Sequence, residues 1–374
     1  MKSVLAKITV FFVTLAVTLS TMFGVFEPST TGNPEDYIDN EIKNVIYLIG
    51  DGMGFNHLEK TKDEMNTKLI MDTFPVKGGS MSRSMNKKVT DSAAGGTALS
   101  VGVRTNNSVI GAYHLDKHSR FCYPKSLTEL CIERGMKTGV VTTDETTGAT
   151  PASFSAHSSD RNNAEDIVSD QLSSDIDLIW GLKNNAADKK EVEKNGFTYV
   201  STYSEMMALE EDSRSYGQFT DVLWGLKQSN KNTPTLEQMA VKAVDLLDDT
   251  DEGFFIMIEG AHIDKHSHSN DSAKMTESLL EFDKTVEAML EYAKADGETL
   301  VIVTADHETG AIVHKDGGYI FTSGSHSGVD VPLLVYGSDK LINNGDVINN
   351  FEIPIRIAYL LGAQKSQFPV AVLS

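Results

Sequence analysis

The strongest constraint on the fold is a series of short, uninterrupted apolar segments that alternate with helical ones. The apolar segments occupy residues 44–50, 137–143, 254–259, 299–305 and, more weakly, 331–337. A continuous apolar run of this length predicts a strand buried on both faces, which is typical of parallel sheets. Helical patterns separate these runs at residues 126–134, 235–247 and 271–295. We therefore expect an α/β fold built on a central, mostly parallel sheet.

The charge balance limits the classes of partner. The chain carries 53 acidic and 33 basic residues, a formal net charge of −20. Such a chain is not expected to bind nucleic acid specifically, because that requires clustered Lys and Arg. Phosphate chemistry would need its own local positive charge. Ten histidines beside many carboxylates make metal ions a plausible source of that charge.

The chain is expected to have a leader, a linker and one domain. Residues 1–24 predict an export signal peptide, with Lys2 and Lys7 before an uncharged apolar stretch. That stretch continues to Phe26, so an uncleaved membrane anchor is the alternative. Residues 25–43 are expected to be a linker and 44–374 a single domain, with polar residues 162–232 as a surface excursion from the sheet. The protein is thus expected to be exported, to an extracellular or envelope location.

The two cysteines leave their pairing open. Cys122 and Cys131 lie nine positions apart, and both a disulfide and two free thiols are compatible with that spacing. Neither cysteine lies in a CxxC or CxxH context, which argues against a zinc site built on thiolates.

Acidic and imidazole side chains follow several of the predicted strands. Asp51 follows the first, Glu259 ends the third, and Asp306 and His307 follow the fourth. In an open parallel sheet, ligands bind beyond the carboxyl ends of the strands. These groups are therefore expected to converge at one edge of the sheet. For Asp306, capping of a following helix is the alternative interpretation.

A histidine-rich segment at residues 259–268 adds metal-ligand candidates, although a solvated polar loop would explain the segment about as well. Asp264 and His268 lie four positions apart, which would place both on one face of a helical turn. His262 and His266 share that spacing and compete for the role. His326, in a Gly-Ser-His-Ser-Gly segment, is a further candidate, although a single histidine in such a segment is more often a loop residue than a ligand.

Residues 90–97 (Thr-Asp-Ser-Ala-Ala-Gly-Gly-Thr) contain the candidate nucleophile, Ser92. Small residues at the start of a helix let a ligand approach the backbone closely. The positive field of a helix N-terminus favours anions and a serine alkoxide. An ordinary N-cap at Asp91 or Ser92 is the alternative.

Taken together and in order, these segments resemble the alkaline phosphatase family. The matching motifs are residues 49–54 (Ile-Gly-Asp-Gly-Met-Gly), 89–94 (Val-Thr-Asp-Ser-Ala-Ala), 147–152 (Thr-Gly-Ala-Thr-Pro-Ala) with Arg161, 258–264 (Ile-Glu-Gly-Ala-His-Ile-Asp), 304–307 (Thr-Ala-Asp-His) and 325–328 (Ser-His-Ser-Gly). The resemblance covers roughly residues 44–162 and 235–340. It implies a three-layer sandwich with helices on both sides of the sheet, and a homodimer.

The resemblance also implies two Zn²⁺ ions and one Mg²⁺ ion per chain. The implied ligands of the first zinc are Asp264, His268 and His326. Those of the second zinc are Asp51, Asp306 and His307, with Ser92 as an exchangeable ligand. Those of magnesium are Asp51, Thr150 and Glu259. This selection leaves His262 and His266 outside the ligand set.

Other residues acquire roles from the same resemblance. Arg161 would clamp two phosphate oxygens, with Asp91 orienting it. Lys265 would reach phosphate through a water, or would be a surface lysine. Gly148 departs from the pattern, because the best-known members carry Asp or His there, near magnesium.

The implied activity is hydrolysis of phosphate monoesters through a phosphoserine at Ser92, with a broad range of small substrates and a role in phosphate scavenging. A related phosphodiesterase or sulfatase on the same metal framework is the first alternative. A non-catalytic extracellular protein that binds metal or phosphate is the second.

Overall fold

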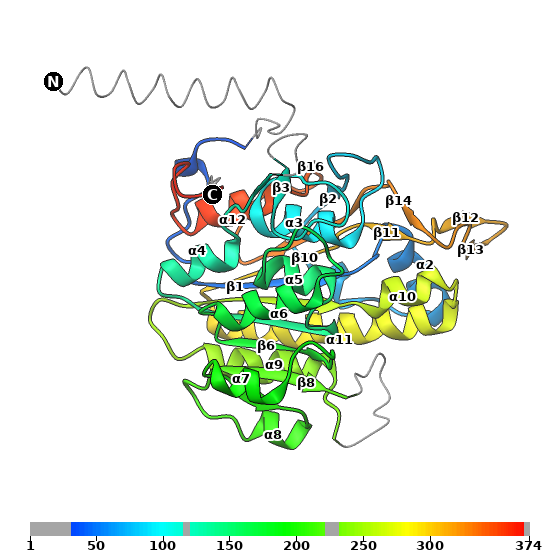
Figure 1. Cartoon of the computed structure of the whole chain (residues 1–374). Helices are drawn as coiled ribbons and strands as arrows, with labels where there is room; N and C mark the ends of the chain where they lie inside the picture. Colours follow the sequence, from blue (N-terminus) through cyan, green and yellow to red (C-terminus); the bar gives the residue numbers. More distant parts are fainter. Residues whose placement is uncertain (1–30, 115–119, 221–231, 370–374) are drawn as a thin grey trace.

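The computed structural model describes residues 31–114, 120–220 and 232–369. In this part of the chain a ten-stranded sheet forms the centre of the molecule (Figure 1). Its strands, in spatial order, are β16 (Val347–Asn349), β2 (Val76–Met81), β15 (Val331–Tyr336), β10 (Thr299–Thr304), β1 (Asn44–Gly50), β9 (Phe254–Gly260), β5 (Lys137–Glu145), β6 (Leu178–Leu182), β8 (Ser215–Phe219) and β7 (Thr198–Val200). Of these ten, β15 runs against its neighbours β10 and β2, and the other pairings are parallel.

The five apolar segments predicted as strands are β1, β5, β9, β10 and β15. Every residue of β1 and β9 is buried, as expected for strands covered on both faces. Side chains alternate between the faces along β1: Ile46 and Leu48 enter one core, whereas Val45, Tyr47 and Ile49 enter the other.

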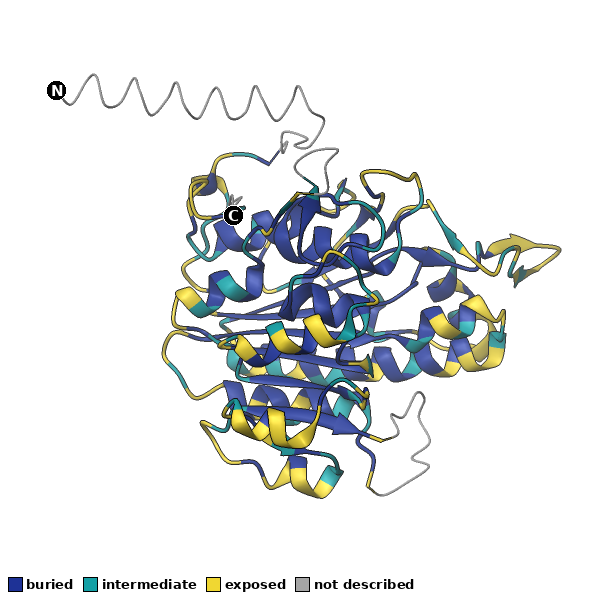
Figure 2. Cartoon of the chain, in the orientation of Figure 1, coloured by how far each residue is buried: buried dark blue, intermediate teal, exposed yellow. Residues whose placement is uncertain are grey.

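Helices cover both faces, which confirms the three-layer sandwich (Figure 2). One layer contains η2 (Ile70–Thr73), α2 (Phe55–Met65), α8 (Tyr203–Met207), α9 (Leu236–Leu247), α10 (His262–His268) and α11 (Ser272–Asp296). The other contains η1 (Pro34–Asp36), α3 (Ser92–Val101), α4 (Leu127–Glu133), α5 (Ala149–Ser155), α6 (Ala164–Ser173), α7 (Lys189–Lys194) and α12 (Glu352–Leu360). The helices expected at 126–134, 235–247 and 271–295 are α4, α9 and α11. Ser126 and Thr235 begin the first two with capping boxes.

The segment 162–232 was expected to leave the sheet, and this expectation is wrong for its described part. Three of its strands, β6, β8 and β7, extend the sheet beyond β5. Polar residues fit inside this extension because they are hydrogen-bonded. Gln218 Nε2, for example, donates to Thr146 Oγ1 at 3.0 Å, and its Oε1 accepts from Asn184 N at 3.0 Å.

Three two-stranded sheets lie outside the central one: β11 (Glu308–Thr309) with β14 (His326–Ser327), β12 (Val313–Lys315) with β13 (Gly318–Ile320), and β3 (Tyr113–His114) with β4 (Phe121–Cys122). The first is the one that matters for the site. It pairs Thr309 with His326 and so brings residues 326–327 beside the end of β10.

Several expectations concern the chain ends and the cysteines. The predicted leader lies outside the described residues, and residues 31–43 of the expected linker include η1, which packs against α12. Cys122 and Cys131 are both buried and are not joined by a disulfide. Within the described ranges, no helix combines the length and the apolar character needed to cross a membrane.

Candidate metal centre and nucleophile

The ends of three adjacent strands set the position of the site. Strand β1 lies between β9 and β10, with Ile49 in register with both Glu259 and Thr304. Asp51 therefore emerges beside Glu259 on one side and beside Asp306 on the other. Burial, then the charges of Asp306, Asp264 and Glu259, raise the pKa of Asp51 well above its ordinary value. Several buried carboxylates in one place repel one another, so bound cations would stabilise their charged forms.

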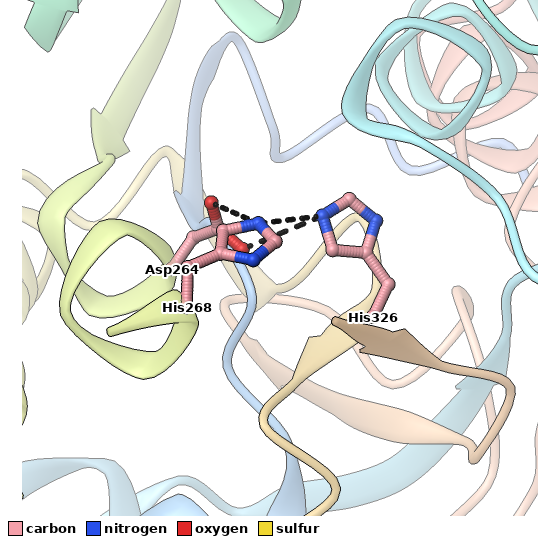
Figure 3. A group of neighbouring side chains, drawn as sticks. All are labelled: Asp264, His268 and His326. Carbon is pink, nitrogen blue, oxygen red and sulfur yellow. Dashed lines mark hydrogen bonds and ion pairs between the residues drawn. The ribbon is translucent and has the colours of Figure 1, made fainter. Parts of the chain in front are cut away.

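A first cluster consists of Asp264, His268 and His326 (Figure 3). Asp264 and His268 project from one face of α10 toward His326, which comes from β14. His268 Nε2 lies 3.3 Å from Asp264 Oδ2 and 3.0 Å from His326 Nε2. His326 Nε2 lies 3.7 Å from Asp264 Oδ1. These three residues thus present one ligand atom each to a common point.

The two imidazoles are oriented by backbone carbonyls. His268 Nδ1 lies 2.8 Å from Gly324 O, and His326 Nδ1 lies 2.9 Å from Thr90 O. A carbonyl can only accept, so Nδ1 carries the proton in both rings, and in the neutral form Nε2 keeps its lone pair. Burial, then the charge of His307, lower the pKa of His326 and favour its neutral form. Two Nε2 lone pairs facing each other at 3.0 Å repel, and a cation bound by both removes that repulsion.

A second cluster surrounds His307, which is fully buried. Its Nε2 lies 3.1 Å from Ser92 Oγ, 3.1 Å from Asp306 Oδ2 and 3.6 Å from Asp51 Oδ1. Burial is the largest single influence and acts to raise the pKa of Asp306, but the charge and hydrogen bond of His307, the charge of His326 and the hydrogen bond from Gly52 N together lower it to about 2. The residues after Asp306 form β11 rather than a helix, so the helix-capping alternative is wrong.

Asp264 belongs to both clusters, a placement that we did not predict. Besides its contacts to His268 and His326, it groups with Asp51 and His307 as a possible metal-ligand set. The hydroxyl of Thr309 donates to Asp264 Oδ1 and lies 3.3 Å from His307 Nδ1. Thr309 was missed in the sequence because its role depends only on this tertiary contact.

The candidate nucleophile begins α3. Ser92 is the first helical residue and Asp91 is the N-cap, accepting from Ala94 N at 2.9 Å. Asp91 Oδ2 also accepts from Ser108 N at 2.8 Å and from Arg161 Nη1 at 3.4 Å. Asp91 is thus both a helix cap and the partner of Arg161, whose side chain is one-third exposed.

A third group lies around Glu259 and Thr150. Thr142 Oγ1 donates to Glu259, and burial, then the charge of Asp144, raise the pKa of Glu259 to about 8. Thr150 lies on α5, which packs against β9. Two oxygens of the predicted magnesium ligands, Thr150 Oγ1 and Asp51 Oδ1, are buried and make no hydrogen bond. Buried oxygens without a partner suit a hard cation.

The remaining predicted residues lie at the margin of the site. Lys265 forms an ion pair with Asp144, a residue that we did not single out in the sequence. His262 and His266 face each other on α10, with ring centroids 5.8 Å apart, and neither belongs to a metal-ligand group among the described residues.

Comparisons with known proteins identify the relatives of this chain. The alkaline phosphatase family model matches residues 42–178 and 181–323. Alkaline phosphatase 4 of Bacillus subtilis (strain 168) is 35% identical over 268 residues, 65% of this chain and 56% of that protein. Alkaline phosphatase of Escherichia coli (strain K12) is 29% identical over 316 residues, 66% of each chain. The chain therefore spans little more than half the length of the Bacillus relative.

Solved structures show the same fold. The alkaline phosphatase of the Antarctic bacterium TAB5 superposes with a TM-score of 0.74 at 30% identity, over 87% of this chain and 99% of that one. The Thermus thermophilus alkaline phosphatase gives a TM-score of 0.75 at 20% identity, over 90% and 96%, and supports the fold alone. Because the family model matches well over half of the chain, the chain belongs to the alkaline phosphatase family.

Proposed function

We propose that the protein hydrolyses phosphate monoesters through a phosphoserine on Ser92. The observation that supports this most directly is the position of Ser92 Oγ at the start of α3, 3.1 Å from His307 Nε2 and beside two clusters of metal-ligating side chains. Broad tolerance of small substrates and a role in phosphate scavenging belong to the same proposal. They rest on the family resemblance.

The donor set fits two Zn²⁺ ions and one Mg²⁺ ion. Histidine and carboxylate are typical zinc ligands, and the paired Nε2 atoms of His268 and His326 support a cation between them. Asp51, Asp306 and His307 would hold the second zinc. Asp51, Thr150 and Glu259 offer the hard oxygens that magnesium prefers. When bound, the metal ions would lower the pKa of a hydroxyl or water and neutralise charge on phosphate.

The side chains of the chain itself then have defined tasks. Ser92 Oγ attacks phosphorus, so that its O–P bond forms while the ester O–P bond breaks and the alcohol leaves. A water then attacks the same phosphorus, the Ser92 O–P bond breaks, and inorganic phosphate is released. Arg161 binds two phosphate oxygens, and Asp91 holds the guanidinium in place.

The test is labelling with a ³²P-monoester followed by acid quench. We expect label on the wild-type chain at low pH and none on Ser92→Ala. Ser100→Ala, which changes another buried serine of α3, is the matched control and should label normally. Label retained by Ser92→Ala would overturn the assignment of the nucleophile.

Substrate class and metal dependence are tested with the same preparations. Monoesters should be hydrolysed faster than diesters and sulfate esters, and the reverse order would favour the phosphodiesterase or sulfatase alternative. Tight binding of metal and phosphate without turnover would instead favour the non-catalytic alternative. Chelation should abolish hydrolysis, with zinc restoring most of it and magnesium adding to it.

Two expectations about the whole protein belong to this proposal. Export rests on the predicted leader, and the homodimer rests on the family resemblance. Light scattering on the purified chain measures its mass in solution, and a monomeric mass would contradict the dimer.

A further inference from the structure

Position 148 lacks a side chain at the edge of the proposed magnesium site. Gly148 is the N-cap of α5, two residues before Thr150. It has φ −53° and ψ 152°, a conformation open to any residue, so backbone strain does not explain the glycine. A Cβ built there would lie 2.6 Å from Asp144 Oδ2 and 2.9 Å from the carbonyl oxygen of Glu145. The carboxylate of Asp144 thus takes up the space that a side chain at 148 would use.

Asp144 is connected to Glu259 through one hydroxyl group. The backbone N–H of Asp144 donates to Thr142 Oγ1 at 2.8 Å, and the same hydroxyl donates to Glu259 Oε2. After burial, the charge of Asp144 is the largest influence on the pKa of Glu259. The two hydrogen bonds thus place the backbone of Asp144 one hydroxyl group away from the Glu259 carboxylate, and the side chain of Asp144 is 25% exposed.

Two buried oxygens of the proposed magnesium ligands have no hydrogen-bond partner among the residues that the structure describes. Thr150 is 1% exposed, and its Oγ1 makes no hydrogen bond. Asp51 Oδ1, also buried, has no hydrogen-bond partner. A magnesium ion bound by such a set keeps several of its waters, and those waters need acceptors around them.

The ammonium group of Lys265 also binds the carboxylate of Asp144. It is paired with Asp144 Oδ1, and its pKa, which burial acts to lower, is raised by Asp144 and further by Glu259 and Asp51. Pairing with Lys265 offsets part of the negative charge of Asp144 that would attract the ion, so Lys265 weakens cation binding through this carboxylate.

We propose that Asp144 is a positioning residue of the third metal site. Its carboxylate accepts hydrogen bonds from the water shell of a divalent cation held by Asp51, Thr150 and Glu259, and Lys265 weakens the site by pairing with it. This inference rests on the proposed function for the identity of the site. Its readout is metal binding, so its failure can be distinguished from a failure of the hydrolytic proposal.

The first experiment is calorimetric titration of Mg²⁺ into the full-length, zinc-loaded protein. Asp144→Asn removes the charge with little change in shape, and we expect Mg²⁺ affinity to fall about 10- to 100-fold, as for residues that orient metal ligands. Glu145→Gln removes an exposed carboxylate one residue away and is the matched control, with an expected change below about threefold. Equal effects of the two variants, or no effect of Asp144→Asn, would overturn the proposal.

A double-mutant cycle separates a specific role from a general loss of charge. Lys265→Ala should tighten Mg²⁺ binding in the wild-type background and have little effect in Asp144→Asn, because its target is then absent. The same gain in both backgrounds would show that Lys265 acts on the cation directly and would contradict the role given to Asp144.

Moving the carboxylate from position 144 to position 148 should restore Mg²⁺ binding. The variant Asp144→Gly with Gly148→Asp moves the acid to the vacant position, and loss of the Asp144 side chain removes the closest obstruction to it. We expect Mg²⁺ affinity to recover to within about tenfold of the wild-type value. Thermal melts of every variant check that each chain is folded. A folded swap variant that binds Mg²⁺ no better than Asp144→Asn would contradict the proposal.

Discussion

The hydroxyl of Ser92 lies 3.1 Å from Nε2 of His307, although the two residues are 215 positions apart in the chain. Ser92 begins α3, and His307 follows β10, so the contact joins a helix N-terminus to the carboxyl end of a strand. The helix dipole favours negative charge at the serine oxygen, and the cations that we propose to bind among the side chains at the strand end would favour it as well.

Replacement of His307 tests whether this contact belongs to a metal site. We expect His307→Gln to lower kcat by about a hundredfold or more, because a group that stabilises the transition state is lost. Bound zinc, measured by atomic emission, should fall by one equivalent per chain. His262→Gln changes another histidine at the same edge of the sheet and should keep the full zinc content. An unchanged zinc content in His307→Gln would exclude it as a ligand.

Asp91 combines two tasks that two substitutions can separate. Asp91→Ala removes the cap of α3 and the acceptor of Ser108 N, so we expect the free energy of unfolding to fall by about 1 to 2 kcal/mol. Asp91→Asn keeps a capping oxygen but loses the charge that faces Arg161. Its stability should change less, whereas KM for a monoester should rise. Urea unfolding and steady-state kinetics check the two expectations, and equal stability losses in both variants would contradict the division of roles.

The sequence predicted the centre of the fold well because the central strands are buried on both faces. The expected bounds of β1, residues 44–50, are those of the structure, and the ligand candidates converge because they follow neighbouring parallel strands. The outer strand β8 is also buried along its whole length, but it was missed because it contains Gln218. This polar residue becomes suitable for burial only through tertiary hydrogen bonds to Thr146 and Asn184.

The residues of the candidate site could also be predicted only in part, because some of their roles depend on tertiary contacts. Spacing along α10 identified Asp264 and His268 as a pair but could not choose between them and His262 with His266 until the family resemblance was considered. The contribution that we propose for Asp144 was not visible in any motif. It depends on the missing side chain at Gly148 and on an ion pair with a residue 121 positions away.

The pH dependence of the metal-free protein follows from Glu259. Burial, then the charge of Asp144, raise its pKa from 4.5 to about 8, and the pKa of Asp51 is raised as well. Between pH 4.5 and about pH 8, Glu259 holds a proton in the folded metal-free chain but has lost it in the unfolded chain. The free energy of unfolding therefore falls as the pH rises toward about 8. Bound metal ions replace those protons and should remove most of the decline.

Thermal unfolding from about pH 7 to about pH 9, with and without chelator, measures this linkage. We expect Tm of the chelated protein to fall across the window and the gap to the metal-loaded protein to widen. A chelated Tm that rises with pH would contradict the assignment of Glu259 as a buried, proton-holding ligand.

Close packing of α3 against the end of β10 provides the last prediction. A Cβ at Gly95 would lie 2.9 Å from the backbone oxygen of Asp306, so the helix that carries Ser92 can approach Asp306 and His307 only with glycine at 95. Gly95→Ala should push the two elements apart and lower kcat by about a hundredfold, because small misplacements at a reacting centre are costly. Gly318→Ala, on the exposed β12–β13 hairpin, has nothing within 4 Å of the new Cβ and is the control that should keep full activity. A fully active Gly95→Ala enzyme would show that the spacing between α3 and β10 does not control the reaction.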